Sequence, residues 1–213
     1  MWAGNERSEP NGIVLTPPED APLRIFAGIR VAGDIADQLA RLARGLERFG
    51  VRPVAAADMH LTLVPPWSAD ATTAGVERVR EVAASFADFP LTFAHLGYGP
   101  DPRRPRLLWA ECEASDVLAR LHSALLHSFS RADERPFQPH VTLARLRERG
   151  RAIARRHPIA RQLTLTQRVC SVELFQSPPA GQRGCRVLAS IPLGDGRRLL
   201  PPAVWVAPTG AGP

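Results

Sequence analysis

The sequence predicts an α+β fold with largely antiparallel sheets, and three observations support this prediction. The hydrophobic period switches repeatedly between two, which is typical of strands, and 3.6, which is typical of helices. Helices and strands do not alternate strictly, as they would around a parallel sheet. The order of a strand, a helix and then a strand with the tetrapeptide H-x-T-L occurs twice, in residues 23–63 and 106–143. We therefore expect two similar lobes, each of which presents one tetrapeptide.

The first repeat begins with the predicted strand Leu23–Ile29. A helix follows, which Asp34 is placed to cap and Gly50 to end. The short strand His60–Val64 closes the repeat, and we expect the two prolines after it to end this strand. The helix is indicated by apolar residues that recur every three or four positions: Ile35, Leu39, Leu42, Leu46 and Phe49.

The remaining elements follow from the same patterns. A helix with Val76, Val79, Ala83 and Phe86 on its apolar side links the two repeats, and a second one begins after Ser115 with Leu118, Leu121, Leu125 and Phe129. The further predicted strands are Leu91–Leu96, Arg106–Cys112, His140–Ala144, Leu163–Phe175 and Arg186–Leu193. The arginine-rich segment 147–161 is predicted to be a loop with a short helix.

Both ends of the chain differ from its middle. Residues 1–22 and 196–213 are rich in proline or glycine and have few large apolar side chains, so we interpret them as tails on a domain that spans 23–195. No apolar run approaches the roughly 18 residues of a membrane span, and residues 1–10 do not resemble a secretory signal. We expect a cytoplasmic protein, monomeric and without an obligate protein partner.

All 27 basic residues are arginine, and the formal net charge is +6. The lack of lysine excludes a P-loop, whose lysine holds the β- and γ-phosphates, and excludes enzymes that work through a covalent lysine. A GC-rich genome would explain most of the arginines. The excess positive charge is still compatible with an anionic partner such as RNA.

The two tetrapeptides, His60-Leu61-Thr62-Leu63 and His140-Val141-Thr142-Leu143, carry the predicted chemistry. In a strand, residues i and i+2 point to the same face, about 6–7 Å apart. The histidine and the threonine of each motif therefore lie on the same face of their strand. Histidine exchanges protons near neutral pH, and threonine donates a hydrogen bond without a charge that would repel an anion. Two such pairs across a cleft would supply a proton acceptor, a proton donor and two hydroxyl anchors, with no metal.

The repetition makes this signal specific. Six histidines and nine threonines in 213 residues give about 0.25 H-x-T matches by chance, so one match would be weak. Two matches that share an aliphatic second residue and a leucine after the threonine are far less expected. The alternative is a pair of strand-end histidines that only bond local backbone groups.

On these motifs the chain resembles the 2H phosphoesterase superfamily and, within it, the bacterial RNA 2′,3′-cyclic phosphodiesterases, also known as 2′-5′ RNA ligases. The resemblance covers about 23–194 and includes the stretches RIFAGI at 24–29, PRLLWA at 105–110, RPFQPHVTLAR at 135–145 and VELFQS at 172–177. It implies a bilobal fold with pseudo-twofold symmetry, with helices on the outer faces and both histidines in a central cleft.

The resemblance also implies roles for the residues of both motifs. His60 would protonate the departing 3′-oxygen, and His140 would take a proton from the attacking water. Thr62 and Thr142 would hold the phosphate oxygens, and the product would be a 2′-phosphomonoester. No metal or nucleotide cofactor is implied.

Three further features have more than one interpretation. Arg145 stands at a position that is often basic in the family, which suggests a phosphate contact, but regular alternation would point it away from His140 unless the strand twists or ends. After the first motif the family commonly continues with a basic residue and an F-L-G turn, whereas this chain has Val-Pro-Pro-Trp. Trp67 could then stack on a base or pack in the core. The arginines of 147–161 could line an RNA path or form a solvated face.

The leading hypothesis is a metal-independent RNA 2′,3′-cyclic phosphodiesterase whose partner is RNA with a cyclic phosphate end. A 2′-5′ RNA ligase, or a phosphodiesterase for another cyclic or 2′-5′-linked nucleotide, would use the same histidine pair. A non-catalytic RNA-binding protein of the same fold is the alternative from a different class, and it would not need an acid–base pair.

Overall fold

The computed structural model describes residues 23–195, apart from residues 50, 70–71, 134, 147–149 and 180–181. The tails expected at 1–22 and 196–213 lie outside the described residues. Among the residues described, no helix has the length and apolar character needed to cross a membrane. The strands are β1 (Leu23–Arg30), β2 (Arg52–Pro53), β3 (His60–Ala69), β4 (Phe89–Gly99), β5 (Leu107–Cys112), β6 (His140–Arg145), β7 (Ala160–Val169), β8 (Ser171–Gln176) and β9 (Arg186–Pro192). The helices are α1 (Gly33–Ala43), α2 (Thr72–Ala83), α3 (Asp116–Ser128) and α4 (Gly150–Arg156), with 3-10 turns at Arg44–Phe49 and Ala56–Asp58.

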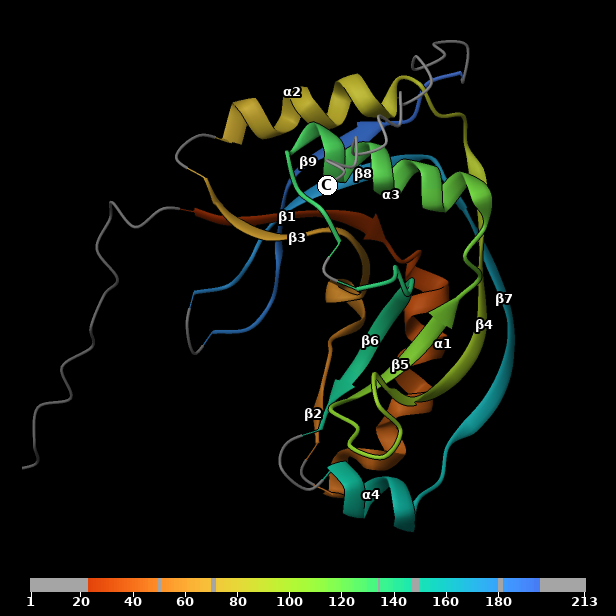
Figure 1. The fold of residues 1–213 in the computed structure, drawn as a ribbon. Coiled ribbons are helices and arrows are strands. Elements are labelled where there is room, and N and C mark those ends of the chain that lie inside the picture. The colour runs from red at the N-terminus through yellow and green to blue at the C-terminus, as the bar shows by residue number, and fades with distance from the viewer. Residues whose placement is uncertain are drawn as a thin grey trace, which may run out of the picture.

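The strands of the described residues form one antiparallel sheet in the order β7-β4-β5-β6-β3-β1-β8-β9, with the short β2 paired to β6 (Figure 1). The sheet has a pseudo-twofold arrangement about its centre, where β3 and β6 meet. On one side follow β1, β8 and β9, and on the other β5, β4 and β7. The predicted α+β fold with two related halves is confirmed, and the halves share a continuous sheet.

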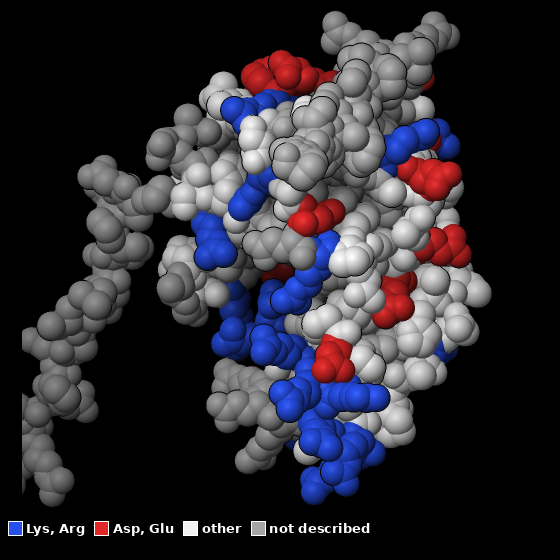
Figure 2. Space-filling view, in the orientation of Figure 1, with Lys and Arg blue, Asp and Glu red and all other residues white. Residues whose placement is uncertain are grey.

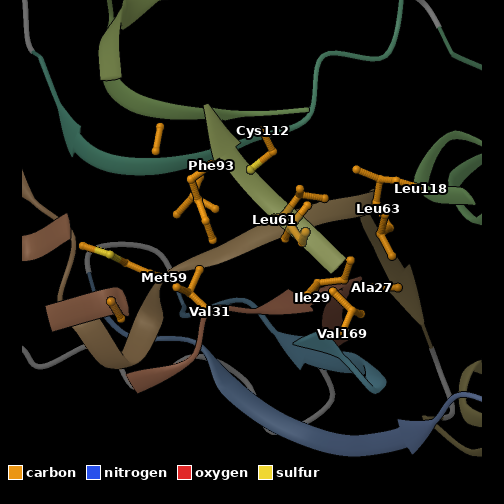
Figure 3. Packing of buried hydrophobic residues seen from close by; sticks show 14 of the residues in the cluster. Ala27, Ile29, Val31, Met59, Leu61, Leu63, Phe93, Cys112, Leu118 and Val169 are labelled. Atoms are coloured by element: carbon orange, nitrogen blue, oxygen red, sulfur yellow. The ribbon is translucent and has the colours of Figure 1, made fainter. Parts of the chain in front are cut away.

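The helices cover the two halves crosswise. Helix α1 follows β1 in the chain but packs against β6, and α3 follows β5 but packs against β3 and α2 (Figure 1). Each motif strand is therefore covered by the helix that precedes the other motif strand. On the side of the sheet that the helices cover, Leu61 and Leu63 point into the buried cluster, together with Phe93 and Leu118 (Figure 3).

The ends of the helices agree only partly with the sequence prediction. The hydroxyl of Ser115 accepts a hydrogen bond from the backbone N–H of Leu118 at 3.4 Å and caps α3, as expected. The cap position of α1 is Ala32 and not Asp34, which lies in the first turn, where its charge favours the helix dipole. Helix α1 ends at Ala43 and continues as a 3-10 turn, and Gly50 lies outside the described residues.

The prediction that Pro65 and Pro66 end the strand of the first motif is wrong, because β3 continues to residue 69. The prolines lie where the register with β1 shifts. Ile25 pairs with Trp67 and Ala27 with Val64, so two steps along β1 match three along β3. Proline has no backbone N–H to donate. A residue in such a bulge is left unpaired in the ladder, so a proline is tolerated there.

The prediction of one strand over Leu163–Phe175 is also wrong, because the chain breaks at Cys170 into β7 and β8. Strand β7 pairs with β4 at one edge of the sheet, and β8 pairs with β1 in the other half. In Figure 1, β7 accompanies β4 along its whole length before the chain crosses to the upper half. Cys170, the one residue between β7 and β8, thus connects the two halves of the sheet.

Candidate active site

The two H-x-T-L tetrapeptides meet at the centre of the sheet. Leu61 of β3 pairs with Val141 of β6, and this is the antiparallel contact that joins the two halves. Leu61 and Val141 are fully buried on the helix side, whereas His60, Thr62, His140 and Thr142 are half-buried on the opposite side. We call that side the histidine face.

Antiparallel pairing at Leu61 and Val141 fixes the neighbours of the polar side chains. Thr62 lies across from His140, and His60 lies across from Thr142. Residues directly opposite have Cβ atoms about 4.5–5.5 Å apart, and diagonal neighbours are about 7–8 Å apart. The two histidines form one such diagonal, and the charge of His140 lowers the pKa of His60, so the polar side chains of the two motifs lie together on the histidine face.

Both imidazole rings are held in the same orientation. The Nδ1 of His60 donates to the backbone carbonyl of Asp58 at 2.7 Å, and the Nδ1 of His140 donates to that of Gln138 at 2.8 Å. In each case the acceptor is two residues earlier in the chain. Because a carbonyl oxygen can only accept, the hydrogen resides on Nδ1, and Nε2 is the atom that can take up or release a proton.

Buried aromatic side chains on the histidine face support both rings. The ring centroid of His60 lies 4.7 Å from that of Phe26 and 5.2 Å from that of Phe175. The ring of His140 lies 4.4 Å from that of Trp109. The indole N–H of Trp109 donates to the carboxylate of Glu111 at 3.1 Å. These contacts limit the rotation of each histidine.

Burial lowers the pKa of both histidines below the usual value, because it disfavours the charged imidazolium. The hydrogen bonds to Asp58 and Gln138 oppose this effect and raise the pKa of His60 and His140 respectively. The charge of Arg145 lowers the pKa of His60 further and the carboxylate of Asp58 raises it, whereas the charge that acts on His140 is the carboxylate of Glu111, which raises its pKa. The two rings are geometrically equivalent but differ in their charged surroundings.

Arg145 lies on the histidine face because of a bulge in β6. One step along β5, from Leu108 to Trp109, corresponds to two steps along β6, from Ala144 to Thr142. Leu143 and Ala144 are consequently both buried, and the alternation resumes with Arg145 on the other side. The electrostatic effect of Arg145 on His60 agrees with this placement. Simple alternation, which pointed Arg145 away from the site, could not anticipate the bulge.

The first motif has the equivalent bulge at Leu63, since Ala27 pairs with Val64 and Gly28 with Thr62. The carbonyl of Leu143 accepts from the backbone N–H of Val54 at 2.8 Å. The carbonyl of Leu63 instead accepts from a side chain, Nδ1 of His122, at 2.7 Å.

His122 is not among the residues that the sequence analysis singles out. The ring is 4% exposed, stacks on Phe137 with centroids 3.7 Å apart, and its Nε2 lies 2.8 Å from the carboxylate of Asp133. Its position on the apolar side of α3, between Leu118 and Leu125, is the one sequence signal that a buried partner must exist.

Trp67 packs in the fold and does not belong to the histidine face. Its ring centroid lies 4.5 Å from that of Phe129, which follows α3, and its indole approaches Gly75 of α2. The structure thus favours the packing interpretation of Trp67 over base stacking. In the arginine-rich segment, residues 150–156 form the expected short helix α4, and residues 147–149 lie outside the described residues.

The fold and the site define a class of α+β protein in which two related halves of one sheet each contribute a His-x-Thr pair to one shared face. A model of the 2′-5′ RNA ligase superfamily matches residues 32–177, which is more than half of the chain. The chain belongs to this superfamily.

Relatives and solved structures agree with this assignment. The chain is similar to the RNA 2′,3′-cyclic phosphodiesterase of Bacillus subtilis, with 31% identity over 96 residues (41% of this chain and 51% of the relative). It is 27% identical to that of Thermotoga maritima over 137 residues (59% and 71%). The alignment thus spans about half the length of the first relative.

The fold is similar to that of the protein TT0787 of Thermus thermophilus, with a TM-score of 0.69 and 23% identity over 81% of this chain and 100% of that one. It is also similar to Escherichia coli LigT in its complex with NADP+, with a TM-score of 0.59 and 26% identity over 81% and 95% of the two chains.

Proposed function

We propose that this protein hydrolyses the 2′,3′-cyclic phosphate at the end of an RNA strand to a 2′-phosphomonoester. The observation that carries the proposal is the matched pair of imidazoles, each with Nδ1 bound to a carbonyl and Nε2 free to exchange a proton beside a threonine of the other motif. The names of the relatives, RNA 2′,3′-cyclic phosphodiesterases, agree with this substrate.

In the proposed reaction, Nε2 of His140 takes a proton from a water molecule, whose oxygen forms a bond to phosphorus. The bond from phosphorus to the 3′-oxygen breaks on the opposite side, and His60 donates a proton to that oxygen. The products are a 2′-phosphate and a 3′-hydroxyl, and the two histidines end with their protonation states exchanged. The assignment of donor and acceptor follows the resemblance, because the two rings are geometrically equivalent.

The neighbouring side chains would stabilise the charge on phosphorus. The hydroxyls of Thr62 and Thr142 would donate to the two non-bridging oxygens, and the guanidinium of Arg145 would contribute a charge-assisted hydrogen bond. Because the aromatic contacts and the carbonyl bonds fix the rings beforehand, most of the rate gain would come from positioning.

Turnover of a defined substrate tests the proposal. The full chain, in EDTA, is incubated with a 12-residue oligoribonucleotide that ends in a 2′,3′-cyclic phosphate. Mass spectrometry measures the gain of one water, and phosphorus NMR distinguishes the 2′- from the 3′-monophosphate. His60→Ala and His140→Ala are compared with His127→Ala, an exposed histidine of α3.

We expect the 2′-phosphate from the parent protein and from His127→Ala, and none from the two site variants. A 3′-phosphate product, or activity that survives in both site variants, would overturn the proposal. Tight RNA binding without turnover would replace the hydrolase with an RNA-binding protein.

The family description supports a second candidate, 2′-5′ RNA ligation. A 5′-hydroxyl would then take the place of the attacking water at the same cyclic phosphate, and the same histidine pair would serve. Adding a second oligonucleotide with a 5′-hydroxyl to the assay distinguishes the two, since ligation yields a longer strand.

A further inference from the structure

A cavity of about 570 Å³ lies between the β4–β5 turn and α4. It belongs to the half of the sheet that contains β4, β5 and β6, at the lower end of the molecule in Figure 1. It is lined by Pro102, Arg103, Arg104, Arg151, Ala154 and Arg155. All four arginines are exposed. In Figure 2 the blue side chains gather at this lower end of the molecule.

The turn and the helix that form this cavity are fixed to each other. The backbone N–H of Leu146 donates to the carbonyl of Arg106 at 2.7 Å, and the hydroxyl of Tyr98 donates to the carbonyl of His157 at 2.8 Å. Gly150, the first residue of α4, approaches the carbonyl of Pro105 so closely that no Cβ could fit. The arginines therefore project from a rigid base.

The charge of the cavity is not compensated within the described part of the chain. None of the four arginines forms an ion pair there, and no acidic side chain among the described residues lines the cavity. The nearby carboxylate of Asp101 accepts the backbone N–H of Arg103 at 2.8 Å, which holds the turn. Four guanidinium groups around one space repel each other unless an anion lies between them, and each can bind phosphate with two parallel hydrogen bonds.

Strand β6 connects this cavity to the histidine face. The strand begins at His140 and ends at Arg145, which pairs with Arg52 of β2, and the chain then leads to α4. The five steps from His140 to Arg145 span about 17 Å. A single anion that contacts both places must therefore be long and must carry negative charge near both of its ends. In Figure 2, further blue side chains lie between the lower end and the middle of the side shown.

We propose that this cavity, formed by Arg103, Arg104, Arg151 and Arg155, binds the phosphodiester backbone of the RNA strand whose cyclic end is held between His60 and His140. This inference rests on the proposed function. The described lining residues include no aromatic side chain on which a base could stack, so the contact is with phosphates and is independent of base sequence. The site would make the enzyme prefer long RNA ends over short ones.

The test compares two substrates of different length, a trinucleotide and a 12-residue oligonucleotide, both with a 2′,3′-cyclic phosphate end. Arg151→Gln/Arg155→Gln and Arg103→Gln/Arg104→Gln remove two charges each from the cavity. Arg80→Gln/Arg120→Gln also removes two charges, from exposed positions of α2 and α3 in the other half, where Arg80 forms an ion pair with Glu77, and it is the control.

We expect each cavity variant to lower kcat/KM for the long substrate at least tenfold and to leave the trinucleotide unchanged. The slope of log affinity against log salt for the long strand should decrease by about 0.7 for each phosphate that the variant no longer neutralises. An equal decrease in kcat/KM for both lengths, or an equal decrease in the control variant, would overturn the proposal.

A binding measurement separates failure of this inference from failure of the proposed function. If the parent protein turns over neither substrate, fluorescence anisotropy of a labelled 12-residue strand with a 2′-phosphate end still reports the cavity. Weaker binding in the cavity variants than in the control supports the RNA site. Equal binding, or complete displacement by an oligoglutamate of the same charge, contradicts it.

Discussion

The Nδ1 of His122 lies 2.7 Å from the carbonyl oxygen of Leu63, the residue that forms the bulge of the first motif. A bulge leaves a carbonyl without a ladder partner, and this buried one is satisfied by a side chain from α3. The Nε2 atom of the same ring lies 2.8 Å from the carboxylate of Asp133, so both ring nitrogens have a partner. His122 thereby ties α3 to the strand that carries His60.

We predict that His122→Phe lowers the free energy of unfolding by about 1–3 kcal/mol, because the carbonyl of Leu63 is then buried without a donor. Chemical denaturation measures the change. His127→Gln, an exposed substitution on the same helix, is the control and should stay within about 0.5 kcal/mol of the parent. A His122→Phe variant as stable as the control would show that the bond contributes nothing.

Gly28 is predicted to be essential for the close approach of β1 and β3. A Cβ at this position would lie 2.5 Å from the carbonyl oxygen of Leu61, so Gly28→Ala must displace the backbone of the first motif. We expect a loss of stability of about 1–3 kcal/mol and a loss of activity beyond what unfolding explains. Gly33→Ala, where nothing lies within 4 Å of the added atom, is the matched control and should be neutral in both assays.

Arg145→Gln should lower kcat/KM about 10- to 100-fold if its guanidinium binds the phosphate, since a hydrogen bond to a charged group contributes about 1.5–3 kcal/mol. The same variant should raise the pKa of His60, because the charge of Arg145 lowers it in the parent protein. NMR titration of the His60 ring measures this shift without substrate. Arg120→Gln, on the exposed side of α3, should change neither quantity. A pKa of His60 that stays the same or falls would contradict the placement of Arg145.

Stability should depend on pH through His60 and His140. Burial lowers the pKa of both in the folded protein, whereas the unfolded chain titrates near the ordinary value of 6.5. Below that value the unfolded state binds more protons than the folded state, so the free energy of unfolding falls as the pH falls toward the lowered pKa values. Above about pH 7 both histidines are neutral in the folded and the unfolded state, so they no longer lower the free energy of unfolding.

Denaturation of the parent and of His60→Gln/His140→Gln at several pH values between about 5 and 8 measures this contribution. The double variant should lose less stability on acidification than the parent does. Parallel pH dependences in the two proteins would mean that the folded pKa values are not lowered. The pH profile of activity would report the coupled pair, and not either ring alone.

The roles of the two histidines are distinguishable with a leaving group that needs no proton. In the proposed reaction His60 protonates the departing oxygen, so His60→Ala should be much less impaired on bis(4-nitrophenyl) phosphate, relative to the parent, than on the cyclic end of RNA. His140→Ala should be impaired on both substrates. The reverse pattern would exchange the two roles.

Much of this site could be predicted from the sequence because local patterns determine it. Alternation in a strand places His60 and Thr62 on one side whatever the tertiary structure is, and the duplication of H-x-T-L implied two equivalent halves. The N-cap at Ser115 is likewise a local feature.

What the sequence did not reveal depends on pairing between distant strands. The bulge that turns Arg145 toward the histidine face is visible only in the register of β5 with β6. The extension of β3 past Pro65 and Pro66 depends on a register shift against β1. The break at Cys170 interrupts no hydrophobic pattern, and it appears only because β7 and β8 join different halves of the sheet.

The central claim is that the two halves contribute one histidine each to a single reaction, and single-turnover kinetics test it most directly. Each protein is mixed in excess over the cyclic-ended RNA, and the four proteins are the parent, His60→Gln, His140→Gln and the double variant. General acid–base catalysis by each ring contributes about 10²–10⁴-fold, and residues that act as a unit are not additive. We predict that each single variant loses nearly all of the rate and that the double variant is hardly slower. Parent-like turnover in either single variant would contradict the account.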